Sequence, residues 1–229
     1  MASIAVLDKG YVSAVEHWGS DERIIEAARM STDKGCQGWD TDAKLLARLW
    51  KHKHATPFEM AGLIVEVKAP IFVFREWHRH RTQSFNEMSA RYVPLPDENY
   101  VPSSANVAER SQAAATTRNR QASGTSAAVL AISDAGRDTA LLIKHYADAQ
   151  NLYEYLLKRG WPKELARLCV PVARYSRMRA SANLRNWLAF LTLRMAPEAQ
   201  WEIRQYANAV GKIIAERFPR TWSLFAEDL

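Results

Sequence analysis

Residues 79–91 read Arg79-His80-Arg81-Thr82-Gln83-Ser84-Phe85-Asn86-Glu87-Met88-Ser89-Ala90-Arg91. This stretch combines three arginines, a histidine, a carboxylate and short hydroxyl side chains, and it follows the apolar run at residues 69–74. Guanidinium groups present fixed forks of N–H donors that match phosphate and carboxylate oxygens. Hydroxyls and exposed backbone N–H groups complete such a cradle. The stretch therefore predicts a binding site for an anionic, phosphorylated ligand.

The sequence before this stretch alternates between helix and strand signals. Residues 5–17 predict a strand or hairpin, and residues 20–30 and 41–52 predict helices from their N-cap candidates and helical apolar spacing. Residues 62–69 alternate with period two, which predicts a strand. We expect residues 71–81 to form a helix that carries the basic cluster near its C-terminal end, where the helix dipole favours cations.

The sequence after it is mostly helical, apart from a polar insertion. Residues 94–131 are rich in Ser, Ala, Thr, Gln and Arg, and we expect a long surface excursion with one polar helix between 105 and 121. The insertion either contacts the anionic ligand through its arginines or is a solvated surface segment. Helices are predicted at 141–160, 183–195 and 197–218, and a strand within 170–182. We interpret 1–229 as a single domain with this insertion.

Composition sets broad limits on the function. At 229 residues and 48% hydrophobic content, the chain is long enough to bury a core, and its net charge of +6 favours anionic partners. Its two cysteines, Cys36 and Cys169, are too few for a disulfide framework, which favours a reducing compartment. Because signal-peptide and membrane-spanning patterns are absent from the sequence, we expect a cytoplasmic protein with no membrane partner.

Two His-x-His pairs raise metal binding as an alternative. They are His52 with His54 and His78 with His80. No third and fourth ligand follows at the usual spacing, and the neighbouring lysines and arginines would repel a dication. We therefore expect no metal site, and a histidine that stacks on or hydrogen-bonds to an aromatic ligand.

Arg194 raises a second question, because it lies on a helical face that is otherwise apolar. A buried guanidinium is costly unless it is paired. We expect either an anionic ligand or a structural ion pair with Glu198 or Glu202.

Three separated motifs together resemble the signature of the flavin-dependent thymidylate synthases. The first is Arg79-His80-Arg81, then seven residues, Ser89, one residue and Arg91; the second is the segment His54-Ala55-Thr56-Pro57-Phe58-Glu59. The third comprises Arg167, Asn183, Arg185 and Arg194. The resemblance extends from about residue 54 to residue 206, interrupted by the polar insertion.

The resemblance implies a fold, an assembly and a reaction. The fold is α/β, in finer terms α+β, with a central, mainly antiparallel sheet flanked by helices and a helical C-terminal half. The assembly is a homotetramer with active sites between subunits. The reaction converts dUMP to dTMP, with methylenetetrahydrofolate as carbon donor, FAD as hydride carrier and NADPH as reductant.

The resemblance also assigns residues. FAD contacts fall on His54, Thr56, Arg79, His80, Arg81, Glu87, Asn183, Leu184 and Arg185. Contacts to dUMP fall on Glu76, Trp77, His78, Arg79, Glu87, Met88, Ser89, Ala90, Arg91, Arg167 and Arg194, with Ser89 and Arg91 on the phosphate. Arg194 is the implied catalytic residue; since arginine stays protonated, it would stabilise negative charge developing on the pyrimidine ring. Two positions depart from the pattern: Glu76 replaces Gln of some relatives, and Ala189 replaces a polar flavin-contacting residue.

Two other classes of protein stay open on the sequence alone. A nucleic-acid-binding protein would use the net positive charge and the eight tryptophans for backbone contacts and base stacking. Against that class, several tryptophans have core-like helical spacing and the arginines are dispersed, so we expect no nucleic-acid partner. The other class is a flavin-binding protein that has lost its activity.

Overall fold

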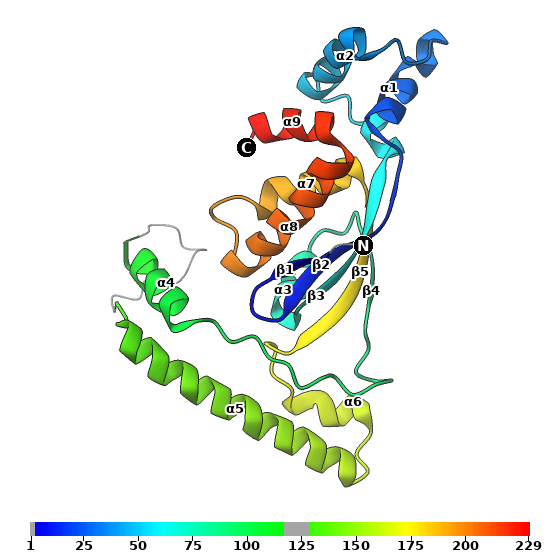
Figure 1. Ribbon diagram of the computed structural model, residues 1–229. Helices are drawn as coiled ribbons and strands as arrows, with labels where there is room; N and C mark the ends of the chain where they lie inside the picture. The colour runs from blue at the N-terminus through cyan, green and yellow to red at the C-terminus, as the bar shows by residue number, and fades with distance from the viewer. Residues whose placement is uncertain (1–2, 117–128) are drawn as a thin grey trace.

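A five-stranded antiparallel sheet, in the order β1-β2-β3-β5-β4, organises the described part of the chain (Figure 1). The computed structural model describes residues 3–116 and 129–229. The strands are β1 (Ser3–Val6), β2 (Gly10–Trp18), β3 (Gly62–Pro70), β4 (Ser84–Glu87) and β5 (Tyr175–Asn183). Every neighbouring pair runs antiparallel, which confirms the predicted central sheet.

The middle strand, β3, shows why the sheet has two unlike faces. Leu63, Val65 and Val67 are fully buried, whereas the alternate residues Glu66 and Lys68 are only half-buried. This period-two alternation is the signal that predicted the strand. It gives the sheet one apolar face, which helices cover, and one polar face.

The helices account for most of the remaining described residues. They are α1 (Asp21–Arg29), α2 (Trp39–Lys51), α3 (Ile71–Trp77), α4 (Ser104–Thr116), α5 (Ile132–Lys158), α6 (Lys163–Ala166), α7 (Leu184–Arg194), α8 (Trp201–Arg217) and α9 (Pro219–Glu227). Short 3-10 helices are η1 (Met30–Thr32), η2 (Thr56–Met60) and η3 (Arg167–Cys169). Among the described residues, no helix has the length and apolar character needed to cross a bilayer.

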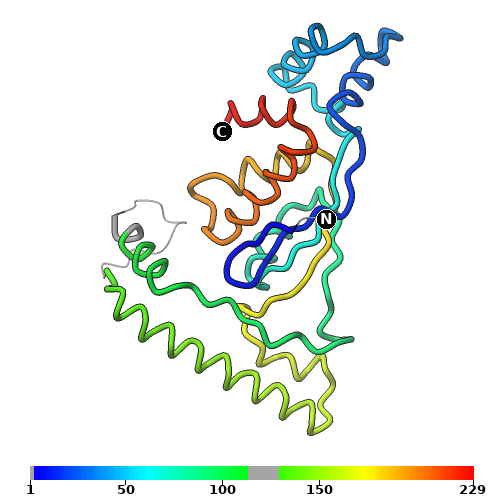
Figure 2. Tube along the Cα trace, in the orientation of Figure 1, coloured from blue at the N-terminus to red at the C-terminus, as the bar shows by residue number. Residues whose placement is uncertain are grey.

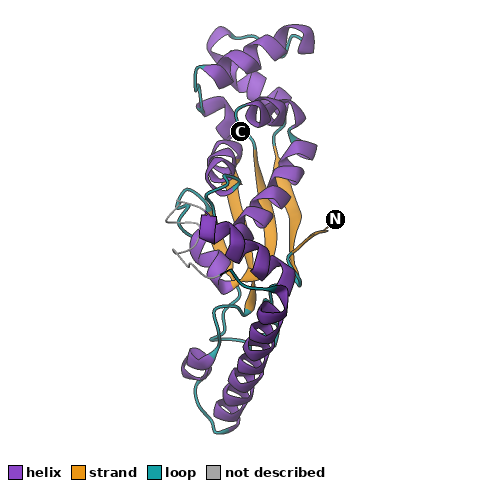
Figure 3. Cartoon of the chain, turned by 90° about the vertical axis from the view of Figure 1, so that its left-hand side faces the viewer, coloured by secondary structure: helices purple, strands orange, loops and turns teal. Residues whose placement is uncertain are grey.

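Helices α3, α7 and α8 pack on the apolar face of the sheet, and α9 packs on α8 (Figures 1 and 3). An aromatic group lies at the centre of this layer: the rings of Trp77 and Phe190 stack with centroids 4.7 Å apart, and Trp187 packs edge-on to Phe190. The polar face carries no helix from the described part of the chain (Figure 1).

The molecule is elongated, with α1 and α2 at one end of the sheet and the long helix α5 at the other (Figures 2 and 3). The predicted apolar stripe on α5 is present, but much of it faces solvent in the single chain. Leu141, Leu152 and Tyr155 are 67%, 47% and 58% exposed. Only Ala135, Tyr146, Ala149 and Tyr153 of this helix are buried.

Several predicted boundaries were wrong. Helix α3 ends at Trp77, so the Arg79-His80-Arg81 segment lies in a turn, in which His80 N donates to Trp77 O at 3.0 Å. Helix α8 begins at Trp201, because the predicted start at Pro197 lies in a preceding turn. The predicted polar helix corresponds to α4, and the rest of its expected range lies outside the described residues.

Candidate functional site

Helix α7 is the element that joins the parts of the site. Asn186, Phe190 and Arg194 follow one another at intervals of four, so they share one face of the helix. This face packs on the segment after α3: Asn186 Nδ2 donates to Thr82 O at 3.1 Å, and the Phe190 and His80 rings meet edge to face, 4.8 Å between centroids. The basic turn at residues 79–81 is therefore held against α7.

Arg194, at the end of α7, is bound by three acceptors. Its Nε donates to His80 Nε2 at 2.8 Å, its Nη1 to Glu76 Oε2 at 2.9 Å, and its Nη2 to the backbone oxygen of Glu76 at 3.0 Å. The acidic partner is thus Glu76, and the expected pair with Glu198 or Glu202 was wrong. Glu202 is buried on α8 and instead pairs with Arg110.

His80 is neutral in this arrangement. Burial lowers the pKa of its imidazole to about 4; the positive charge of Arg194 lowers it too, and Glu76 opposes them. Since Nε2 accepts the Arg194 hydrogen bond, the ring proton belongs on Nδ1. His80 therefore orients Arg194 without adding charge.

A cavity of about 590 Å³ opens between α1, the segment before η2 and the start of α7, lined by residues that include His54, Thr56 and Arg185. A neighbouring cavity of about 300 Å³ shares His54 and Arg185 and extends along α7 to Ala189 and Thr192. The structure thus brings together three of the predicted cofactor residues, all of them exposed. Lys53, which lines both cavities, was not predicted; its position between two histidines was the only signal in the sequence.

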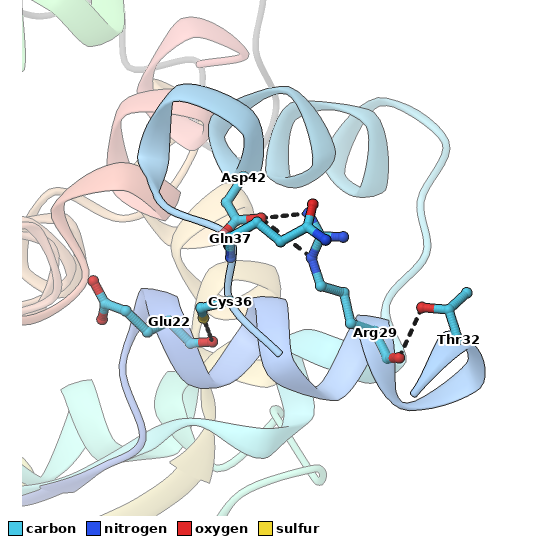
Figure 4. A network of polar contacts seen from close by, with 6 residues as sticks. All are labelled: Glu22, Arg29, Thr32, Cys36, Gln37 and Asp42. Atoms are coloured by element: carbon cyan, nitrogen blue, oxygen red, sulfur yellow. Dashed lines mark hydrogen bonds and ion pairs between the residues drawn. The ribbon is translucent and has the colours of Figure 1, made fainter. Parts of the chain in front are cut away.

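One wall of the larger cavity is α1, and a polar network fixes its connection to α2 (Figure 4). Asp42, which is almost fully buried, accepts from Arg29 Nη2 at 2.5 Å and from Gln37 N at 2.8 Å. Cys36 Sγ donates to Glu22 O at 3.4 Å. These contacts hold the connection that follows α1 against the helix, which keeps the cavity wall in place.

The predicted phosphate-binding residues gather at the far end of β4. Arg91 N donates to Ser89 Oγ at 3.3 Å, and Arg91 Nε lies 3.5 Å from Glu164 Oε2. Arg167 Nε donates to the backbone oxygen of Glu164 at 3.4 Å, so Arg91 and Arg167 both contact Glu164 of α6. The four-residue strand β4, roughly 13 Å long, separates this group from His80 and Arg194.

Other predicted residues divide into accessible and buried ones. Arg79 and Arg81 are exposed, and neither forms an ion pair with a described residue. Trp77 and Leu184 have no exposed surface, because their side chains belong to the core. Ala90 is also buried, and His78 Nε2 lies 3.1 Å from Met178 Sδ. Of these, only Arg79 and Arg81 present their side chains freely to a ligand.

The remaining predicted residues lie beside these groups. Asn183 caps α7, its Oδ1 accepting from Asn186 N at 2.9 Å, and Glu87 and Met88 follow one another at the end of β4. A third cavity, of about 1040 Å³, lies elsewhere, along β1 and α8, and none of the predicted site residues lines it. No cluster of three or more His, Cys, Asp or Glu suited to a metal ion occurs in the ranges described.

The chain is similar to known proteins along most of its length. The profile of the family Thy1, "Thymidylate synthase complementing protein", matches residues 13–220. The chain is 44% identical to a flavin-dependent thymidylate synthase of Thermus thermophilus over 99% of its own length and 79% of that protein. It is 40% identical to the enzyme of the same name from Anaplasma marginale, over 98% and 74%.

A solved structure, the UMP/dUMP methylase PolB from Streptomyces cacaoi bound with 5-Br dUMP, superposes with a TM-score of 0.82 at 30% identity. The superposition covers 98% of this chain and 97% of that one. With the family profile spanning most of the sequence and close relatives matching over nearly all of it, the chain belongs to the flavin-dependent thymidylate synthase family.

Proposed function

We propose that this chain catalyses the reductive methylation of dUMP to dTMP, with methylenetetrahydrofolate as carbon donor, FAD as hydride carrier and NADPH as reductant. The observation that carries the proposal is the double role of α7. One face of this helix lines a cavity through Arg185 and Ala189, and the next face fixes the guanidinium of Arg194. A redox cofactor and a substrate-activating cation would therefore lie on adjacent faces of one rigid element.

The cavity fits FAD in its chemistry. Apolar walls from Leu49, Phe58 and Leu188 suit a planar ring, while Lys53 and Arg185 suit a pyrophosphate. Arg79 and Arg81 supply further exposed guanidiniums on the neighbouring turn. When bound, FAD would supply the hydride-transfer chemistry. Ala189 offers no polar group at this wall, so that contact of the family pattern is missing here.

Arg194 acts by electrostatics. An arginine stays protonated at physiological pH, so it does not serve as a base. Three of the five guanidinium N–H groups are used by Glu76 and His80, which leaves two donors for a pyrimidine carbonyl or ring nitrogen. Fixed in this way, Arg194 would stabilise the negative charge that develops on the ring as N3 loses its proton.

The phosphate of dUMP would bind at the end of β4. Ser89 and Arg91 lie in one turn, and Arg167 approaches the same place through Glu164. Arg91 and Arg167 are exposed, so both are accessible to an anionic ligand. Guanidinium pairs of this kind suit phosphate oxygens.

A homotetramer would complete the sites. The polar face of the sheet is uncovered by described helices, and α5 exposes Leu141, Ile143, Leu152 and Tyr155 in the single chain. Apolar surface of this kind is typical of protein–protein contacts. The separation of Arg194 from Arg91 across β4 supports an assembly in which neighbouring subunits contribute to one nucleotide site.

The proposal is tested on the purified protein with two readouts. We expect a flavin absorption spectrum, and NADPH oxidation that requires both dUMP and methylenetetrahydrofolate. A flavin spectrum without dUMP-dependent oxidation would instead favour the flavoprotein that has lost activity. A colourless protein that cannot be reconstituted with FAD would overturn the proposal.

A further inference from the structure

The guanidinium of Arg194 is held by one short segment of the chain. The carboxylate of Glu76, the backbone oxygen of Glu76 and the ring of His80 each accept from a different nitrogen. The side chain of Arg194 is 16% exposed and that of Glu76 is 40% exposed. A cation that is proposed to face the substrate is therefore already paired with an anion.

The charges of this group nearly cancel. Arg194 contributes one positive charge and Glu76 one negative charge, and Arg194 Nη1 lies 2.9 Å from Glu76 Oε2. His80 accepts a hydrogen bond from Arg194 through Nε2, so that nitrogen carries no proton and the ring adds no positive charge. The segment also carries the titratable side chains of Arg75, His78, Arg79 and Arg81. Among the described residues, Glu76 nevertheless forms its ion pair with Arg194. At short range the carboxylate reduces the field that Arg194 exerts on a neighbouring group.

Stability alone is a weak reason for this ion pair. Pairs with a half-exposed partner contribute little to folding, and Arg194 already has two other acceptors. The carboxylate is instead placed where it affects what Arg194 does to a ligand.

We propose that Glu76 is a positioning residue that fixes Arg194 and offsets its charge, so that the resting site selects a nucleotide with a neutral pyrimidine ring. This inference rests on the proposed function, because it concerns the ring that Arg194 would activate. It makes Glu76 a determinant of specificity between neutral and anionic rings. Replacing the carboxylate with an amide keeps an acceptor for Arg194 but leaves its charge without compensation.

The test compares dUMP with 5-bromo-dUMP, whose electron-withdrawing bromine makes N3 more acidic. Dissociation constants are measured by calorimetry on the FAD-loaded protein, from neutral pH upward until N3 of the analogue is ionised. In the unmodified protein we expect 5-bromo-dUMP to lose affinity relative to dUMP as its N3 ionises, because the site takes the neutral ring. In Glu76→Gln we expect the ratio to shift toward the ionised analogue by about tenfold, equivalent to one unit in the pKa of N3.

A matched control is available at Lys68–Glu98. That pair is 2.7 Å long with 17% and 37% exposure, close to the 16% and 40% of Arg194–Glu76, and Glu98 has no role in the proposed site. Glu98→Gln should leave the ratio unchanged. The inference is overturned if Glu76→Gln matches this control.

The unmodified protein gives an independent check that does not depend on a variant folding. A strong preference for the ionised analogue in the unmodified protein would overturn the inference while leaving dTMP synthesis intact. If the unmodified protein binds neither nucleotide, the proposed function itself fails, which is a distinguishable result.

Discussion

Arg194 is the residue on which the proposed chemistry depends, and its contacts allow a direct prediction. Because it lies at the C-terminal end of α7 and not in the cavity wall, Arg194→Ala should retain bound FAD. Loss of a fixed cation next to developing negative charge should lower kcat by roughly 10²–10³-fold. Flavin absorbance and steady-state kinetics measure both effects. Arg204→Ala, which removes a hydrogen bond to Pro197 O, is the control. Unchanged turnover in Arg194→Ala would exclude Arg194 from the catalytic role.

Arg81 gives the complementary prediction, loss of cofactor. It is exposed and forms no ion pair with a described residue, so its removal should cost little stability. Arg81→Ala should lower the ratio of flavin to protein absorbance after purification. Arg75→Ala removes an exposed arginine of the same segment that has no assigned contact, and it should keep its flavin. A fully flavinated Arg81→Ala protein would contradict the assignment.

His80 links the site to the pH dependence of stability. Burial lowers the pKa of His80 from 6.5 to about 4, so between these values the unfolded chain binds a proton that the folded chain does not. The free energy of unfolding should therefore fall as the pH drops from 6.5 to about 4, with no further contribution from His80 below. His80→Asn should flatten this part of the profile of melting temperature against pH. His145 is an exposed histidine on α5, and His145→Asn should leave the slope intact. Equal slopes in the two variants would show that His80 does not cause this pH dependence.

At the scale of elements, the sequence predicted what local patterns encode. The alternation of β3 and the apolar spacing of α7 are visible within a few residues, so both elements were predicted close to their observed bounds. The early end of α3 was not predicted, because it depends on a turn in which Trp77 Nε1 donates to the buried Gln83. Helix α5 was predicted too short, since its first turns, residues 132–140, are mostly polar and contain Gly136.

Contacts between distant segments were the least predictable part of the site. The Arg194 partner was sought among acids nearby in sequence, but Glu76 lies 118 positions away. Nothing local distinguishes Glu76 from a solvated acid. His54, Thr56 and Arg185 were named through family resemblance, and their common cavity depends on the packing of α7 against η2.

The N-terminus of α7 gives a prediction at this scale. Asn183 Oδ1 accepts from Asn186 N at 2.9 Å, so Asn183→Ala should cost about 1 kcal/mol of stability. Since Arg185 lies in the first turn of this helix, FAD affinity should fall as well. Ser20→Ala removes the corresponding cap of α1, at the opposite end of that helix from the cavity-lining Ala27 and Ala28, and should cost similar stability while retaining FAD. Thermal unfolding and flavin titration separate the two effects; equal FAD affinity in both variants would contradict the role of Asn183.

At the scale of the whole molecule, we expect active sites shared between subunits. The dispersed positions of Arg167 and Arg194, and the exposed apolar residues of α5, both favour such an assembly. Arg167→Ala and Arg194→Ala should each be inactive alone. After mixing with subunit exchange, some sites would combine intact residues from different subunits, so activity should return. A mixture that stays inactive, or a protein that runs as a monomer in light scattering, would contradict shared sites.

The most direct measurement follows one carbon atom. The purified protein is incubated with dUMP, NADPH and methylenetetrahydrofolate labelled with ¹³C at the methylene group, and the nucleotide product is examined by mass spectrometry and NMR. We predict dTMP with the label in its C5 methyl group, formed only when the protein carries FAD. Unlabelled dTMP, or unchanged dUMP with fully flavinated protein, would contradict the proposed reaction.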